Sequence, residues 1–286
     1  MFAATEYRLR QVAAVVGDLS ASLAQVEAVL GLKVGHRDPG VAKYGLENAI
    51  LPIGAQFLEL VAPTQDGTSA GRYLERRGGD AGYMLIFQAS SAEDHRKRLS
   101  QLGVHGIEYC GGEAYGSRTA PSLDGSHDAA LSAFAQVHHM THFHPRDFTG
   151  ILASIDSAPT VPDWRAPHSD WYPAGADWRG SLTDFCTGLR AVDIQSADPT
   201  AAAGQWSRML ALPVEGGETP EIRTSDCTLR FVPPVDADGT GFVALHVGVR
   251  SVERARDAAD RCGALNPSGA VRLAGMEIVL VEAGAA

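Results

Sequence analysis

The segment GAQFLELVAP, residues 54–63, is a short apolar run that carries aromatic and β-branched side chains and is bounded by a glycine and a proline. This composition predicts a buried strand. Because side chains alternate along a strand, Glu59 shares one face with Phe57 and Val61, and leucines occupy the other face. A carboxylate in such a place must be hydrogen-bonded, bound to a metal or protonated, since an unpaired buried charge is very costly. The alternative is an edge strand whose Glu59 faces solvent.

The composition predicts a soluble globular protein with room for two modules. The chain has 286 residues, of which 45% are hydrophobic, enough for a substantial core. The net charge of -10 argues against nucleic acid and anionic membranes as partners, because those surfaces need clustered Lys and Arg. The N-terminus lacks the signature of a secretory signal and no apolar run approaches about 18 residues, so we expect a cytoplasmic protein. The four cysteines are scattered without a C-x-x-C pair, which favours free thiols.

One β-α-β-β-β unit recurs along the chain. In the first copy a strand at 9–16 precedes a helix that Asp18 caps and Gly31 ends. The second copy begins at Gly82, and shorter copies begin at Leu189 and Phe242. The strands expected after the helices are 33–37, 44–52 and 55–61, then 106–109, 117–120, 135–144 and 150–155, then 222–224 and 228–232, then 271–273 and 277–282. Repetition with the strand order preserved predicts paired units in two modules.

Residues 67–71, GTSAG, match the G-x-S-x-G pattern of a hydrolase nucleophile elbow. The elbow needs a tight turn directly off the strand, whereas a Pro-Thr-Gln stretch intervenes here. We therefore expect Thr68 or Ser69 to cap a helix at 70–77 instead.

A segment rich in proline and tryptophan, residues 157–186, separates a first module at 1–156 from a second, shorter module at 187–286. Its tryptophans at 164, 171 and 178 are seven residues apart, but the intervening prolines exclude a heptad helix. We interpret the segment as a linker that aromatic side chains anchor to the surface it crosses. A ligand cage built from these tryptophans is the alternative.

Three stretches carry a family resemblance: LRQVAAVVGDL at 9–19, FLELVAP at 57–63 and HFHPRDFTGILASI at 142–155. They resemble the vicinal-oxygen-chelate superfamily, which includes glyoxalase I, methylmalonyl-CoA epimerase, extradiol dioxygenases and antibiotic-sequestering resistance proteins, and most closely its glyoxalase-like branch. The resemblance covers 9–156 well and 189–282 more weakly. It implies an α+β fold of two modules, each built from paired β-α-β-β-β units that form a half-barrel around a cavity.

The resemblance also implies a divalent metal held by His or Glu on the first and last strands of the paired units. The matching positions here are Gln11, Glu59, Met84 and Ser154. Only Glu59 is a strong oxygen ligand, and a thioether and a hydroxyl do not suit Zn²⁺, Mn²⁺ or Fe²⁺. We therefore expect the superfamily's metal site to be degraded. We make no firm prediction of a cofactor, and a divalent metal stays open.

The second module offers even less at the matching positions, which are Ala191, Arg230, Ala244 and Val279. These mostly small, apolar residues predict a packed core without a metal. Arg230 is the exception, because an arginine there could hold a carboxylate or a phosphate.

Histidines are concentrated in QVHHMTHFHP, residues 136–145. On a strand, His138, His142 and His144 would share one face, with neighbours two apart separated by about 7 Å. Three interpretations stay open: a relocated metal site of these three histidines, polar cavity groups without a metal, or a purely structural role in which 144–147 form a tight turn.

Two functions fit these residues. The first is an enzyme, with lyase, isomerase or dioxygenase-type chemistry, acting on a small oxygenated or carbonyl-containing molecule. Its base is Glu59, whose pKa burial would raise, and its acid or hydrogen-bond donor is His142. The side chains expected to bind or orient the substrate are Gln11, Tyr83, His138 and Ser154. The alternative is a non-catalytic protein that binds or sequesters a small molecule, as the bleomycin-resistance type does; a homodimer is open in either case.

Overall fold

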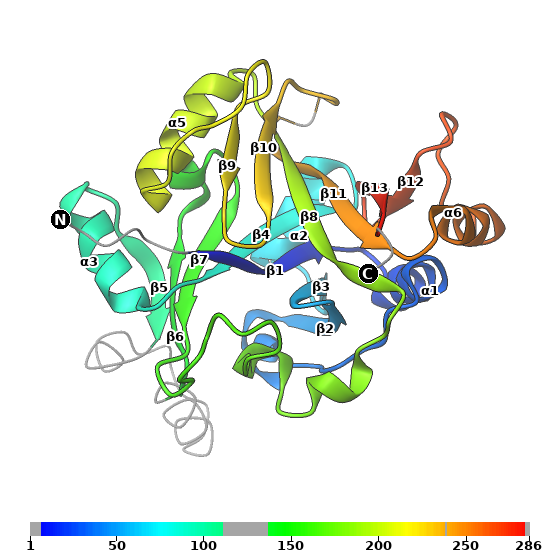
Figure 1. Cartoon of the computed structure of the whole chain (residues 1–286), viewed down its shortest axis with the longest axis horizontal. Coiled ribbons are helices and arrows are strands. Elements are labelled where there is room, and N and C mark those ends of the chain that lie inside the picture. Colours follow the sequence, from blue (N-terminus) through cyan, green and yellow to red (C-terminus); the bar gives the residue numbers. More distant parts are fainter. Residues whose placement is uncertain (1–6, 111–136, 238, 284–286) are drawn as a thin grey trace.

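The computed structural model describes residues 7–110, 137–237 and 239–283, and within them two mixed β-sheets with a few helices (Figure 1). The strands of the first sheet are β1 (Arg8–Val15), β2 (Leu46–Ile53), β3 (Gln56–Pro63), β4 (Ala81–Gln88), β5 (Gly106–Cys110), β6 (His139–Phe143) and β7 (Leu152–Ser157). The strands of the second sheet are β8 (Cys186–Gln195), β9 (Glu221–Arg223), β10 (Thr228–Val232), β11 (Gly241–Val249), β12 (Val271–Leu273) and β13 (Met276–Glu282). The predicted α+β fold with two modules is confirmed.

The two sheets follow the same pairing rule. Their orders are β2-β3-β1-β4-β7-β6-β5 and β12-β13-β11-β8-β10-β9. In the first, β1 runs parallel to β3 and antiparallel to β4; in the second, β8 runs parallel to β10 and antiparallel to β11. Each sheet therefore joins two copies of the unit through their first strands, as the sequence repeat predicts.

The helices are α1 (Leu19–Leu30), α2 (Ser69–Arg77), α3 (Ala92–Gln101), α5 (Pro199–Leu210) and α6 (Val252–Arg261). The side chain of Asp18 accepts a hydrogen bond from the Ala21 N–H, and Gly31 ends α1 in the left-handed conformation. Thr68 caps α2 in the same way, which confirms the capping interpretation of the GTSAG stretch. None of the helices in the described ranges is long and apolar enough to cross a membrane.

Two predicted strands need correction, and a third, 117–120, lies outside the described residues. Residues 33–37 form only an isolated bridge between His36 and Ile50. The ladder stops there because the next N–H to face β2, that of Asp38, bonds to the side chain of Asn48 and not to the main chain. In the described part of the predicted strand 135–144, which starts at residue 137, the strand is limited to His139–Phe143, and the short helix Pro145–Phe148 follows with His144 as its cap.

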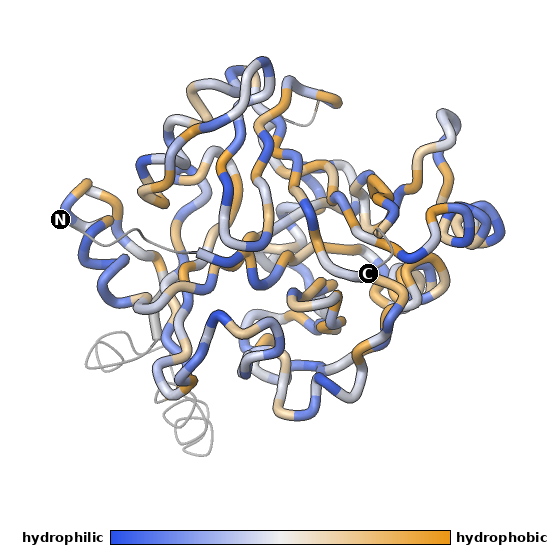
Figure 2. Tube along the Cα trace, in the orientation of Figure 1, coloured by the Kyte–Doolittle hydropathy of each residue, from blue (hydrophilic) through white to orange (hydrophobic). Residues whose placement is uncertain are grey.

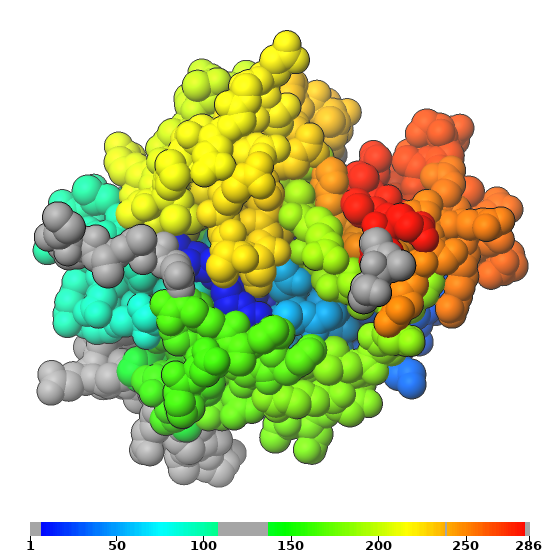
Figure 3. Space-filling view, viewed as in Figure 1, coloured from blue at the N-terminus to red at the C-terminus, as the bar shows by residue number. Residues whose placement is uncertain are grey.

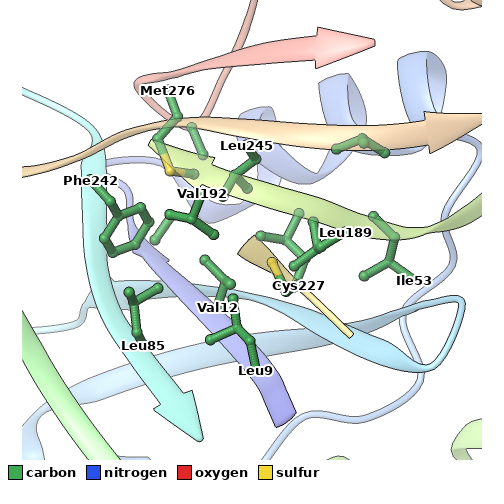
Figure 4. Packing of buried hydrophobic residues seen from close by; sticks show 14 of the residues in the cluster. Leu9, Val12, Ile53, Leu85, Leu189, Val192, Cys227, Phe242, Leu245 and Met276 are labelled. Atoms are coloured by element: carbon green, nitrogen blue, oxygen red, sulfur yellow. The ribbon is translucent and has the colours of Figure 1, made fainter. Parts of the chain in front are cut away.

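The main core lies between the two sheets. Leu9, Val12 and Leu85 of the first sheet point toward Val192 and Leu245 of the second (Figure 4). Hydrophobic residues follow the central strands, whereas α3 and α6 are largely hydrophilic (Figure 2). The leucines that flank Glu59 belong to this core, as their alternation predicts.

The linker covers the opposite face of the first sheet, which we call the concave face. Between β7 and β8 the chain passes beneath β2 and β3 and forms much of the lower surface of the molecule (Figures 1 and 3). Trp171 and Trp178 are 1% and 0% exposed and pack there with Phe57, Val61, Met84 and Ile86. The predicted aromatic anchoring is therefore confirmed for these two tryptophans.

The described cysteines are free thiols, as expected: Cys186, Cys227 and Cys262. The side chain of Cys110 lies outside the described part of the chain.

Candidate functional site

Glu59 lies on β3, an inner strand, so the edge-strand alternative is wrong. Its side chain is 8% exposed, and each carboxylate oxygen accepts one hydrogen bond from a neutral amide. Gln11 Nε2 donates to Oε2 at 2.8 Å, and Asn48 Nδ2 donates to Oε1 at 2.6 Å. A buried carboxylate with two such donors has its charge compensated without an ion pair.

Two groups that can only donate fix the orientation of these amides. The indole Nε1–H of Trp171 donates to Gln11 Oε1 at 2.8 Å, and the Asp38 N–H donates to Asn48 Oδ1 at 2.8 Å. Since an indole and a main-chain N–H cannot accept, both amide oxygens must face away from Glu59. Both amide NH₂ groups therefore point at the carboxylate.

The surroundings of Glu59 favour a proton acceptor. Burial raises the pKa of Glu59, while the hydrogen bonds from Asn48 and Gln11 oppose the rise; the nearby Asp38 adds to it and His142 lowers it. The net direction is upward, which is the direction that brings a carboxylate toward the range of a general base.

Tyr83 and His142 complete the polar groups near Glu59. Burial, and after it the neighbouring Tyr73 and Glu59, raise the pKa of Tyr83. His142 lies on β6, which three strands separate from β3 in the sheet order, yet its charge acts on Glu59, so the sheet must curl to bring the two near each other. Tyr83, Met140, His142 and Leu152 are half-buried and mark where this face meets solvent.

A second buried network lies farther along the same face. His138 Nε2 is 2.9 Å from Asp156 Oδ2, and the Ser154 hydroxyl donates to Asp156 Oδ1. His138 and Ser154 are both fully buried. The ring of Trp171 lies edge-on to His138 with 5.0 Å between centroids, so this tryptophan touches both networks.

The residues at the superfamily's metal positions do not fit a metal. The Gln11 carbonyl oxygen is engaged by Trp171, and the Ser154 hydroxyl by Asp156. Met84 supplies only a thioether, which hard divalent ions do not favour. Glu59 alone is a suitable ligand, and we derive no step through a metal.

The relocated histidine site is not assembled either. His144 turns away from the face, and its Nδ1 accepts a hydrogen bond from the Arg146 N–H. Within the described ranges no group of three or more His, Cys, Asp or Glu side chains is placed to hold a metal ion. The three histidines were grouped by strand alternation, which ends at Phe143 because the following residues turn into a short helix.

The second module carries an ionic cluster where a packed apolar core was expected. In the first sheet Glu59 of β3 lies opposite Ala13 of β1, and in the second sheet Arg230 of β10 lies opposite Asp193 of β8. Arg230 therefore occupies the position in the second module that Glu59 occupies in the first. Arg230 Nη1 lies 3.0 Å from Asp193 Oδ1 and 3.0 Å from His246 Nε2. The apolar core predicted from Ala191 and Ala244 is wrong because Asp193 and His246, two residues farther along the same strands, place polar side chains beside Arg230.

With the geometry described, the comparisons identify the family. The sequence matches the glyoxalase-like domain over residues 12–210, more than half of the chain, and the protein belongs to this family. No curated protein shows a significant match.

Several solved structures resemble this chain in fold. A variant of 4-hydroxymandelate synthase from Streptomyces coelicolor aligns with a TM-score of 0.63 at 16% identity, covering 91% of this chain and 76% of that one. A hypothetical protein from Staphylococcus aureus aligns with a TM-score of 0.64 at 10% identity, covering 97% and 99%. Methylmalonyl-CoA epimerase from Mycobacterium tuberculosis aligns with a TM-score of 0.42 at 21% identity, covering 58% and 97%. The predicted resemblance to the glyoxalase-like branch is confirmed by the domain match, and the likenesses to the synthase and to the Staphylococcus aureus protein show the fold alone.

Proposed function

We propose that the protein is an enzyme of the isomerase or lyase kind that moves a proton on a small carbonyl-containing molecule, with Glu59 as the base. One observation carries the proposal: a buried carboxylate with a raised pKa is held by two amides of fixed orientation. Neutral donors hold the carboxylate in place and leave it more basic than an ion pair would.

The proposed step begins with the ionised form of Glu59. Each of its oxygens accepts one amide hydrogen bond and keeps a lone pair for a substrate proton. The carboxylate takes a proton from the carbon beside the substrate carbonyl, and the electron pair of that C–H bond moves toward the carbonyl oxygen. Return of the proton to another position, or expulsion of a leaving group, completes an isomerisation or an elimination.

Tyr83 and His142 are the donors proposed for the developing oxyanion. Both are half-buried on the solvent-facing part of the face, and both interact electrostatically with Glu59. Gln11 holds the carboxylate of Glu59 by a hydrogen bond. His138 and Ser154 have a structural role, because their full burial leaves them little access to a substrate.

The second candidate is a binding protein without turnover. The half-buried Tyr83, Met140, His142 and Leu152 place aromatic, apolar and polar groups together where this face meets solvent. This mixture suits a partly aromatic ligand held beside a few polar groups.

Glu59→Gln separates the two functions, because it keeps the shape of the side chain and removes the base. Thermal-shift screening of small carbonyl compounds supplies a ligand, and its affinity and turnover are then compared in wild type, in Glu59→Gln and in Glu47→Gln, an exposed glutamate on β2. We expect Glu59→Gln to bind the ligand and lose turnover while Glu47→Gln keeps both. Binding without turnover in the wild-type protein would support the second candidate.

A further inference from the structure

The linker reaches Glu59 through two consecutive hydrogen bonds. Trp171 is 1% exposed, and its indole N–H donates to Gln11 Oε1 at 2.8 Å. Gln11 Nε2 in turn donates to Glu59 Oε2 at 2.8 Å. A residue outside both sheets thus acts on the carboxylate at the centre of the first module.

We propose that Trp171 is a positioning residue, which locks the Gln11 amide as a hydrogen-bond donor to Glu59 in both protonation states of that carboxyl group. The inference rests on the proposed role of Glu59 as the base.

The argument depends on what happens after Glu59 takes up a proton. A glutamine amide has nearly the same shape when its oxygen and nitrogen exchange places, and a protonated Glu59 could donate to the oxygen of a flipped Gln11. That arrangement would stabilise the protonated form and slow release of the proton. With Trp171 in place, a flip would set the indole N–H against the amide NH₂ and leave buried donors without acceptors, which costs about 1–3 kcal/mol for each.

Trp178 provides a matched control within the same linker. It is 0% exposed, packs on the same face, and contacts Phe57 edge-on. Its Nε1 has no hydrogen-bond partner in the part of the chain that the structure describes. Trp178→Phe therefore removes the same indole volume as Trp171→Phe without removing a donor to Gln11.

The pKa of Glu59 is the readout, followed by ¹³C NMR of the side-chain carboxyl and assigned with Glu59→Gln. We expect Trp171→Phe to raise this pKa by about one unit, because one donor to the ionised form becomes free to turn away. Trp178→Phe should leave it unchanged. In a Gln11→Met background Trp171→Phe should add nothing further. Equal pKa changes in the two tryptophan variants, or none in Trp171→Phe, would overturn the proposal.

A measurement on the wild-type protein keeps the test decisive if Trp171→Phe does not fold. During a pH titration, the side-chain NH₂ of Gln11 and the indole N–H of Trp171 should shift with the pKa of Glu59, and the indole N–H of Trp178 should not. Gln11 and Trp171 signals that ignore this titration would contradict the proposal. Because both experiments follow the titration of Glu59, they stand apart from turnover: a missing enzymatic activity would refute the proposed function and leave the positioning role in place.

Discussion

Glu59 and Arg230 occupy equivalent places in the two modules, yet their partners differ in charge. Glu59 accepts hydrogen bonds from two neutral amides, whereas Arg230 lies 3.0 Å from the carboxylate of Asp193 and 3.6 Å from that of Glu221. An ion pair holds a charge in place, and an amide pair leaves the carboxylate able to change its charge. This difference supports our proposal that proton transfer takes place in the first module. Arg230, for which the sequence left open a role in holding a carboxylate or a phosphate, already has two carboxylates of the protein beside it.

Because His95 on α3 is buried, we predict that the folded protein loses stability in acid. It is 7% exposed, its Nδ1 lies 2.8 Å from the Tyr7 hydroxyl, and burial lowers its pKa from 6.5 to about 4. Between these values the unfolded chain binds a proton that the folded chain does not, so stability is full above pH 6.5 and falls as the pH drops toward 4. By about pH 4 this residue lowers the free energy of unfolding by about 3 kcal/mol.

Urea unfolding of wild type and His95→Gln at pH 7.5 and pH 4.5 measures this contribution. Subtracting the variant cancels the carboxylates that titrate in the same range. We expect wild type to lose more stability than His95→Gln on acidification, and equal losses would refute the assignment.

Alternation along one strand predicted the face and burial of Glu59, but not all of its partners. Gln11 was expected near it from the family resemblance, in which Gln11 and Glu59 occupy matching ligand positions. Asn48 was not, although it is a lone amide in an apolar strand, because its approach depends on the pairing of β2 with β3. Trp171 could not be placed, since nothing local determines the path of a Pro-rich linker. Asp156 was missed for the same reason as Asn48: it meets His138 only after the strands pair.

The linker is fixed to the first module because an arginine side chain on β1 donates hydrogen bonds to main-chain carbonyls of the linker. Arg10 donates to Pro167 O at 3.1 Å and to Ser169 O at 2.7 Å. Its guanidinium carbon lies 5.1 Å from the centre of the Phe57 ring and 5.7 Å from that of Trp171. Burial lowers the pKa of Arg10 to about 9, so it is still a cation at neutral pH. The linker is thus held in a fixed position against the face of the first sheet that carries Glu59.

Arg10→Met should weaken the attachment of the linker to the first module. The variant keeps an apolar stem but leaves the Ser169 carbonyl without its donor and the Pro167 carbonyl with only Arg8 Nη2 at 3.5 Å, so we expect a loss of about 3 kcal/mol. Arg165→Met, at an exposed arginine of the same linker, should change stability by no more than about 0.5 kcal/mol. Urea unfolding and limited proteolysis compare the two, and a linker equally resistant in both variants would count against the anchoring role.

The two modules form one molecule through a shared core and close backbone contacts. Gly275, in the turn between β12 and β13, lies so near the first module that an added Cβ would be 1.7 Å from the Asp80 carbonyl oxygen. Gly82 has a similar approach to Phe242, with an added Cβ 2.4 Å from its ring. The repeat predicted two similar modules, but not the residues at which they touch, because contacts between modules leave no periodic pattern.

Gly275→Ala tests the close packing of the modules. Gly263 is the control, because it has a similar positive φ of 69° against 76° but no atom within 4 Å of an added Cβ. Gly263→Ala should cost about 1 kcal/mol from backbone strain alone. We expect Gly275→Ala to cost at least about 2 kcal/mol more, since main chain must move. Similar unfolding midpoints for the two variants would show that the modules do not meet there as described.

Hydrogen–deuterium exchange at carbon tests whether the first module contains a base. Small carbonyl compounds that bind the protein are incubated with it in D₂O, and ¹H NMR follows the loss of signal from the C–H beside the carbonyl. We predict exchange with wild type and with Glu47→Gln, and a rate at least about a hundredfold lower with Glu59→Gln, the usual contribution of a general base. Exchange by Glu59→Gln at the wild-type rate would contradict the assignment of Glu59 as the base.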